Sequence, residues 1–199
     1  MTDADAALRA RNLRTLALLA ALFLVPLLLA FCTYYGSSWR PGGSVANGVL
    51  IQPPRPLPQA VLASLGGAAA TDSLFRDKWS LVYVGDGACT AACRETLWTM
   101  RQTRLALNND MTRVARVFLV SGGCCAREFL ASEHPGLQVL DAQGPQAAAL
   151  LAQFPATERE HTLFIVDPLG NLMMSYDTRQ NPRGLLEDLK KLLRLSHIG

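Results

Sequence analysis

Three residues of this chain, Cys89, Cys93 and His161, are of types that can bind a soft metal ion or exchange disulfides. The two cysteines are four positions apart and follow an apolar run at 81–85 that is typical of a buried strand. The residues after them read as a helix, and positions i and i+4 of a helix share a face, so both sulfurs can point at one spot. A helix N-terminus also favours a thiolate, because its free N–H groups and its dipole stabilise negative charge. The pair predicts a site that holds a soft metal ion or interconverts with a disulfide.

Parallel strands would bring these residues to one edge of a sheet. Residues 81–85 and 114–120 read as strands, and a right-handed strand–helix–strand connection makes them parallel. Ligands of open α/β sheets bind at the carboxyl edge of such strands. If the strand predicted at 162–166 runs antiparallel to them, His161 at its beginning lies at the same edge. The prediction of one shared site depends on that orientation.

The rest of the pattern predicts an α/β domain with a mixed sheet. A turn at 167–170 has Asp, Pro and Gly where tight turns favour them. A leucine stripe at helical spacing follows Asn181 and Pro182, which form a helix-start signal. Strand, helix, strand, hairpin and closing helix are typical of this class. The other predicted elements are an edge strand at 49–51, helices at 90–108 and 146–154, a short element at 136–141 and a hairpin strand at 171–176.

The N-terminal region reads as a membrane anchor. A run at 16–31 contains no charged residue and is preceded by three arginines, Arg9, Arg11 and Arg14. With its flanks it predicts a transmembrane helix over 15–35, close to the roughly 20 residues that a bilayer requires. The positive charges predict a cytoplasmic tail at 1–14 and a domain in the periplasm, beyond a bacterial-type inner membrane. A cleaved signal peptide is the alternative, and the lack of an Ala-x-Ala site after the run favours the anchor.

Residues 36–58 are rich in Gly, Pro and Ser, which predicts a tether between the anchor and a folded domain at 59–199. That length is enough for one domain with its own core. The net charge of +3 is small and is spread along the chain, without a Lys/Arg cluster. Nucleic-acid binding is therefore not expected. An exported domain meets oxidising conditions, in which paired cysteines form structural or working disulfides.

The chain resembles the SCO/SenC family of membrane-anchored, thioredoxin-fold proteins that assist copper insertion into cytochrome oxidase. Cys-Thr-Ala-Ala-Cys at 89–93, after a strand, is similar to the family's Cys-x-x-x-Cys motif. The stretch at 161–170 resembles the family's copper-binding His, strand and Asp-Pro-x-Gly turn, and a single N-terminal anchor is also typical. The prolines and the acidic residue usual in and after the cysteine loop are replaced by Ala91, Ala92 and Arg94, so this is a divergent member.

The resemblance implies a thioredoxin-like mixed sheet flanked by helices, and a copper ion bound by Cys89, Cys93 and His161. It also implies a metallochaperone whose client is the cytochrome oxidase subunit that carries the dinuclear copper site. The donor types agree with copper, because thiolate suits the cuprous ion and imidazole helps to hold the cupric ion. A structural zinc site would require a fourth protein ligand, which the sequence does not indicate.

Two other functions remain open for the same residues. In a thiol–disulfide oxidoreductase that reduces client cysteines during oxidase maturation, Cys89 would attack and Cys93 would resolve. In a scaffold or accessory subunit, the two cysteines would form a permanent bridge. The exposed strand-to-helix loop expected at the cysteines, together with His161, favours a working site.

A second cysteine pair, Cys124 and Cys125, follows the second parallel strand and is expected at the same edge as Cys89. One hypothesis is that either residue resolves a disulfide with Cys89 or Cys93, or supplies a further metal ligand. The alternative is two small loop residues, or a pair bonded to each other.

Structural roles are expected for the remaining candidates. Met173 and Met174 face opposite sides of a strand, so core packing is expected of them. The other predictions are packing roles for Trp79 and Trp98, a turn role for Asp167, surface positions for His134 and His197, and a membrane position for Cys32.

Overall fold

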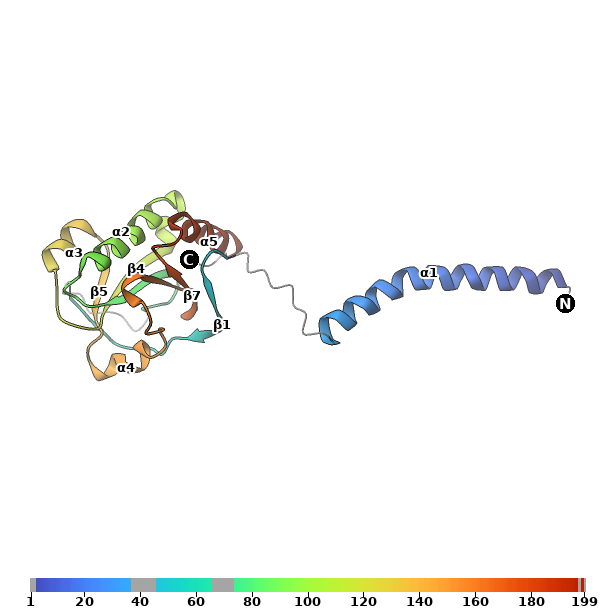
Figure 1. The fold of residues 1–199 in the computed structure, drawn as a ribbon, viewed down its shortest axis with the longest axis horizontal. Coiled ribbons are helices and arrows are strands. Elements are labelled where there is room, and N and C mark those ends of the chain that lie inside the picture. The colour runs from blue at the N-terminus through green and yellow to red at the C-terminus, as the bar shows by residue number, and fades with distance from the viewer. Residues whose placement is uncertain (1–2, 37–45, 66–73, 197, 199) are drawn as a thin grey trace. The chain divides into compact units, whose positions relative to one another are not determined.

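The structure is a computed structural model that describes residues 3–36, 46–65, 74–196 and 198. The chain divides into two units, Met1–Ser44 and Val45–Gly199. Helix α1, Asp3–Gly36, makes up the described part of the first unit, and the second unit contains a sheet with helices on both faces (Figure 1).

Helix α1 contains the predicted anchor and extends it toward the N-terminus. Its segment Arg11–Gly36 is 26 residues long and apolar enough to cross a bilayer. The core helix of a soluble domain is mostly buried, whereas no residue in the most apolar window of this segment is buried. Length, composition and exposure therefore support the predicted single-pass anchor.

The sheet of the second unit has seven strands in the order β1-β7-β6-β3-β4-β5-β2. The strands are β1 Val49–Pro56, β2 Ala63–Ser64, β3 Trp79–Gly85, β4 Val114–Val120, β5 Gln138–Asp141, β6 Thr162–Val166 and β7 Asn171–Asp177. The helices are α2 Ala91–Leu105, α3 Arg127–Glu133, α4 Pro145–Leu151 and α5 Pro182–Leu195, with short 3-10 helices η1 Asn108–Arg113 and η2 Arg159–His161.

Strand β3 lies at the centre of the sheet, and all seven of its residues are buried. Because neighbouring side chains of a strand face opposite sides, β3 contributes to two apolar cores. Leu81 and Tyr83 enter the core under α2, α3 and α5, whereas Val82 and Val84 enter the core under α4. Figure 1 shows α2 and α5 on one face of the sheet and α4 on the other. The predicted α/β class with a mixed, thioredoxin-like sheet is confirmed.

The strand directions are those on which the predicted site depends. Strand β3 is parallel to β4, with Gly85 opposite Val120, and antiparallel to β6, with Tyr83 opposite Leu163. The assumption that the strand before the hairpin runs antiparallel to its neighbour is therefore confirmed. The short element predicted at 136–141 is strand β5, parallel to β4.

Strand β1 is the edge strand predicted within the tether, and it is longer than predicted. It pairs antiparallel with β7, with Val49 opposite Ser175. For this reason the compact unit begins at Val45, earlier than the predicted boundary at 59. The described residues 46–58 of the predicted tether therefore lie in this unit.

Three details of the helices differ from the prediction. Helix α3 was not predicted, the helix predicted at 90–108 ends at Leu105, and the helix predicted at 146–154 runs from Pro145 to Leu151. The side chain of Trp98 is 57 % exposed, so the packing role predicted for it is wrong. Helix α2 buries Leu97 and Met100, and Trp98 lies about 100° around the axis from Leu97, toward solvent. Trp79 is buried, as predicted.

Candidate functional site

Cys89 and Cys93 are joined by a disulfide, and the loop between β3 and α2 positions them. Helix α2 begins at Ala91, so Cys93 lies in its first turn and Cys89 lies before it. The prediction that helical i and i+4 spacing aligns the sulfurs is therefore wrong. Cys89 instead has a positive φ of 51°, and this turn brings its Cα to 5.0 Å from the Cα of Cys93.

Both cysteines are buried, whereas an exposed loop was predicted. Each is 2 % exposed and belongs to the apolar core under α2, which also contains Tyr83 and Phe118. Partly buried side chains of the segment around α3 pack against the same core, among them Phe129. A bulky thiol reagent therefore cannot reach these sulfurs without a local movement.

His161 is the last residue of η2, and hydrogen bonds tie the backbone of η2 to α2 and to Thr178, the residue after β7. Thr96 of α2 donates its hydroxyl to the carbonyl of Glu160 over 2.9 Å. Thr178 donates both its N–H and its hydroxyl to the carbonyl of His161, each over 2.9 Å. Thr96 lies three residues after Cys93, so the His161 segment is attached to the helix that carries one cysteine.

The electrostatics of Tyr83 show that the two segments approach the same side chain. Burial and the negative charges of Glu160 and Asp86 raise the pKa of Tyr83 to about 12. Glu160 precedes His161 in η2, and Asp86 begins the loop that leads to Cys89. The loop and η2 therefore both lie close enough to act on this hydroxyl.

The imidazole of His161 contains a buried polar atom. Its Nδ1 is buried and has no hydrogen-bond partner among the described residues. A buried nitrogen without a partner lowers the stability of the fold, and a ligand that binds to it in another state of the protein would explain its presence. However, no group of three His, Cys, Asp or Glu side chains in the described part of the chain is placed to hold a metal ion.

The predicted donor set fits copper in chemical type but is not preassembled. Metals bind thiolates, and the sulfurs of Cys89 and Cys93 are bonded to each other. Copper binding by this set would therefore require reduction of the disulfide and a movement that brings the sulfurs and the imidazole of His161 together.

The raised pKa of Tyr83 predicts a loss of stability in alkali. In an unfolded chain tyrosine ionises near pH 10. Between about pH 10 and about pH 12 the unfolded state loses this proton first, so the free energy of unfolding falls as the pH rises, by roughly 2 kcal/mol. Tyr83→Phe keeps the ring and should flatten this fall in urea unfolding of the full chain in detergent. Tyr35→Phe, an exposed position in α1, is the control and should leave the fall unchanged.

Cys124 and Cys125 are bonded to each other in the loop between β4 and α3. Because β4 is parallel to β3 and in register with it, this loop lies beside the Cys89 loop, as predicted. The carboxylate of Asp86 joins the two loops: it accepts hydrogen bonds from the N–H of Ala88 over 2.7 Å and from the N–H of Gly123 over 3.1 Å. Of the alternatives left open, the structure has the bonded pair.

His134 is buried at 4 % exposure, so the predicted surface position is wrong. Its ring packs edge-on against Phe129, and the next residue, Pro135, accepts a hydrogen bond from the buried Arg116 of β4. Burial, followed by the positive charges of Arg116 and Arg101, lowers the pKa of His134. His197 lies outside the described residues.

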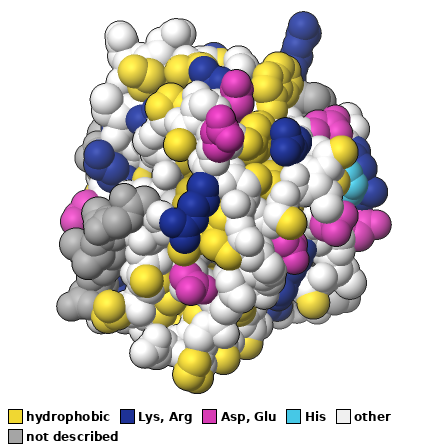
Figure 2. All heavy atoms as spheres, turned by 90° about the vertical axis from the view of Figure 1, so that its left-hand side faces the viewer, with side chains coloured by type: hydrophobic (Ala, Val, Ile, Leu, Met, Phe, Trp, Pro, Cys, Tyr) yellow, Lys and Arg dark blue, Asp and Glu magenta, His cyan; other side chains and the backbone are white. Residues whose placement is uncertain are grey.

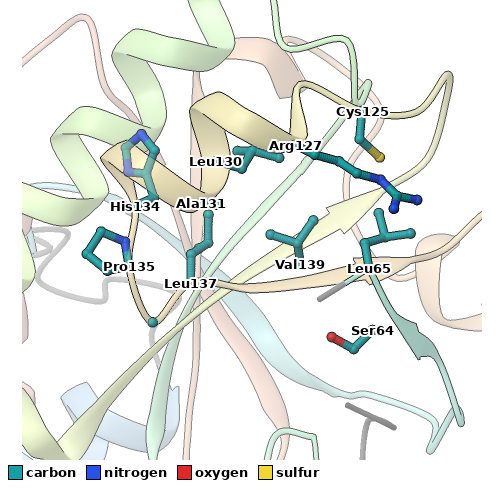
Figure 3. A pocket seen from close by; sticks show the side chains of 11 residues that line it. Ser64, Leu65, Cys125, Arg127, Leu130, Ala131, His134, Pro135, Leu137 and Val139 are labelled. Carbon is teal, nitrogen blue, oxygen red and sulfur yellow. The ribbon is translucent and has the colours of Figure 1, made fainter. Parts of the chain in front are cut away.

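A pocket of about 240 Å³ lies between α3, β5 and residues 64–65 at the end of β2 (Figure 3). Its walls are mainly apolar, and Cys125 and Arg127 lie together at one end, with the sulfur directed toward the Arg127 side chain. The lining residues are Ser64, Leu65, Cys125, Arg127, Leu130, Ala131, His134, Pro135, Gly136, Leu137 and Val139. The pocket could not be predicted from the sequence, because α3, which forms one of its walls, was not predicted.

The remaining candidates have structural roles. The carboxylate of Asp167 accepts hydrogen bonds from the N–H groups of Leu169 and Asn171, which confirms its turn role. Met174 is buried in the core under α2, and Met173 packs against that core. Cys32 is exposed on α1 and is not bonded to any described cysteine.

The domain matches the model of a known protein family. The family model described as "Transmembrane-like, thioredoxin-like, C-terminal domain" matches residues 79–196, which contain both cysteine pairs and His161. The chain belongs to this family. No curated protein matches the chain.

Solved structures of similar fold include SCO proteins, with which this member of the thioredoxin-like family shares little sequence. Apo Sco1 from Thermus thermophilus is 22 % identical, with 76 % of this chain and 100 % of that chain covered and a TM-score of 0.58. Copper-bound ScoI from Bradyrhizobium japonicum is 18 % identical, with 68 % and 98 % covered and a TM-score of 0.54. The predicted resemblance to SCO proteins is confirmed at the level of the fold.

The same fold also occurs in a DsbF homologue from Corynebacterium diphtheriae, which is 14 % identical, with 77 % of this chain and 96 % of that chain covered and a TM-score of 0.55. The fold alone therefore does not choose between copper binding and other functions. On the face shown in Figure 2, basic and acidic side chains are interspersed among apolar ones.

Proposed function

We propose that this chain is a membrane-anchored copper chaperone in which reduced Cys89 and Cys93, together with His161, bind one copper ion. Its client would be the cytochrome oxidase subunit that carries the dinuclear copper site. The domain would face the periplasm from the inner membrane, in agreement with the arginines before the apolar run.

One observation carries the proposal. Strand β6 runs antiparallel to β3, so the segment of His161 lies at the edge of the sheet from which the Cys89 loop leaves. The carboxylates of Glu160 and Asp86 both act on Tyr83, which supports the closeness of the two segments. The free Nδ1 of His161 supports a ligand role, because imidazole nitrogen binds copper well.

The chemistry begins with reduction of the Cys89–Cys93 disulfide. Two thiolates are then available for cuprous copper. The hydrogen bond from Thr96 attaches η2, which carries His161, to the helix that carries Cys93, so a local movement would bring the imidazole to them. Transfer to the client would proceed by ligand exchange, in which client ligands replace these donors one at a time. Oxidation of the pair would remove both thiolate donors and end binding.

The test uses the full chain in detergent, reduced with a phosphine and titrated with cuprous ion against a chromogenic chelator. We expect one ion per chain, and we expect Cys89→Ser or Cys93→Ser to weaken binding by at least about 100-fold. Cys32→Ser makes the same substitution in α1 and should leave the affinity unchanged. A reduced wild-type chain that takes up no copper would disprove the proposal.

A second candidate function, thiol–disulfide exchange with client cysteines, is favoured by the disulfide itself and by the lack of a preassembled ligand group in the described chain. There Cys89 would attack and Cys93 would resolve. His161→Ala separates the two functions: a chaperone loses its cupric binding, whereas an oxidoreductase keeps its exchange rate within about twofold. Thiol labelling that never responds to reductant would instead indicate a permanent bridge.

A further inference from the structure

The two cysteine pairs differ in accessibility, although their loops lie side by side. Cys89 and Cys93 are buried, whereas Cys124 is exposed and Cys125 is partly buried at the wall of the pocket in Figure 3. Thiol–disulfide exchange requires direct access of the attacking sulfur to the disulfide. A reductant from solution therefore meets the Cys124–Cys125 bridge before it can meet the other.

The loops that carry the pairs are in direct contact. The N–H of Ala126 donates to the carbonyl of Gly87 over 2.9 Å, and the N–H of Ser121 donates to the carbonyl of Gly85 over 2.9 Å. A Cβ atom on Gly87 would lie 3.2 Å from the Cα of Cys124. Cys125 packs against the core that contains Cys89 and Cys93. The backbones around both disulfides therefore touch, and no other described element separates them.

A side chain of α2 also connects the two regions. Arg94, which follows Cys93, donates its Nε–H to the carbonyl of Cys89 over 3.3 Å. Its guanidinium also stacks over the ring of Phe129 in α3, 4.3 Å from the ring centre. This contact holds α3, and with it the Cys124–Cys125 loop, against the start of α2.

From this arrangement we propose that Cys124 and Cys125 form a second redox pair that passes electrons from an external dithiol to the buried Cys89–Cys93 disulfide. The inference rests on the proposed function, because copper binding requires that disulfide to be reduced. In this relay, electrons enter at the exposed Cys124–Cys125 pair beside the pocket, and the external reductant is a dithiol.

The relay transfers two electrons in a series of thiol–disulfide exchanges. A thiolate of the external dithiol attacks the Cys124–Cys125 bridge, and its second thiol resolves the mixed disulfide, so the reductant leaves as a disulfide. The Cys125 thiolate then attacks a sulfur of the Cys89–Cys93 bridge, whose S–S bond breaks and whose leaving sulfur takes a proton. Cys124 attacks the sulfur of Cys125, which restores their bond and releases the second thiol. Two electrons and two protons have passed to the buried pair.

The test follows both pairs separately in the oxidised full chain in detergent. Dithiothreitol is added, the reaction is stopped with an alkylating reagent, and the tryptic peptides are analysed by mass spectrometry. Trypsin places each pair on its own peptide, residues 79–94 and residues 117–127. In the wild type, we expect labelling of 117–127 to precede labelling of 79–94. In the Cys124→Ser/Cys125→Ser variant, labelling of 79–94 should slow at least about tenfold.

A single substitution traps the intermediate. Cys124→Ser leaves the Cys125 thiolate without its resolving partner, so a disulfide linking peptide 79–94 to peptide 117–127 should accumulate. Equal rates of reduction of Cys89–Cys93 in the wild type and the double variant would overturn the relay, as would the lack of the linked peptide. Copper uptake after phosphine reduction is measured in parallel. If that uptake fails while the rates differ as expected, the copper proposal falls and the relay stands.

Discussion

Replacing Gly87 by Ala is expected to lower the free energy of unfolding by about 3 kcal/mol. The added Cβ would lie 2.4 Å from the carbonyl oxygen of Gly123 and 2.9 Å from a methyl group of Val120. The first of these atoms belongs to the backbone, so the clash cannot be relieved by a rotamer change. The two cysteine loops would have to separate. Urea unfolding of the full chain in detergent, followed by near-UV circular dichroism, measures the loss.

The matched control is Gly123→Ala in the facing loop. Its Cβ would have ordinary contacts, the nearest being an oxygen of Asp86 at 3.6 Å, so we expect a change of less than about 1 kcal/mol. Equal stability of the two variants would show that the loops are not packed as described. Because the relay depends on this contact, Gly87→Ala should also slow reduction of the Cys89–Cys93 bridge, whereas Gly123→Ala should not.

The second large effect is expected for Asp188→Ala in α5. The carboxylate of Asp188 is buried and accepts hydrogen bonds from the N–H groups of Asn47 and Gly48, over 2.7 and 3.0 Å, just before β1. The amide side chain of Asn47 donates to its other oxygen over 3.1 Å. Hydrogen bonds to a charged group stabilise more than neutral ones, and their loss leaves donors unsatisfied, so we expect a cost of about 3 kcal/mol.

Asp110→Ala is the control for this experiment, because the side chain of Asp110 is exposed and its ion pair with Arg113 contributes less than about 1 kcal/mol. Hydrogen exchange of the β1 amides reports the local effect. They should exchange faster in Asp188→Ala than in Asp110→Ala. Unchanged exchange in both variants would mean that Asp188 does not hold β1 against α5.

The local sequence pattern was sufficient to predict most of the strands of the sheet. Strands β3, β4 and β6 were predicted because they are continuous apolar runs between turn residues. Helix α5 was predicted from its start signal, and Asn181 indeed accepts a hydrogen bond from the N–H of Gly184 as an N-cap. Helix α3 was missed because it is seven residues long and has no side-chain cap. Such a helix forms only through tertiary contacts, here those of Phe129 and Leu130.

Two of the errors at individual side chains also arise from helices whose existence or start the local sequence did not indicate. His134 was expected at the surface because it precedes a proline, but at the end of the unpredicted α3 its ring packs against Phe129. The cysteines were expected to align through helical spacing, but the helix starts two residues after Cys89. Trp98 is different, because the period of 3.6 already places it away from Leu97 and Met100 on the helix.

The amino-acid sequence by itself determined the apolar anchor helix, the central strands and the shared sheet edge of Cys89 and Cys124, whereas the antiparallel direction of β6, which brings the His161 segment to that edge, was an assumption that the structure confirmed. These depend on periodicity and on the handedness of strand connections, which a short stretch of chain already contains. Only the tertiary structure decided that one disulfide is buried and its neighbour is accessible, and that Asp86 joins their loops. Burial and contact arise between residues far apart in the chain, and no local pattern records them.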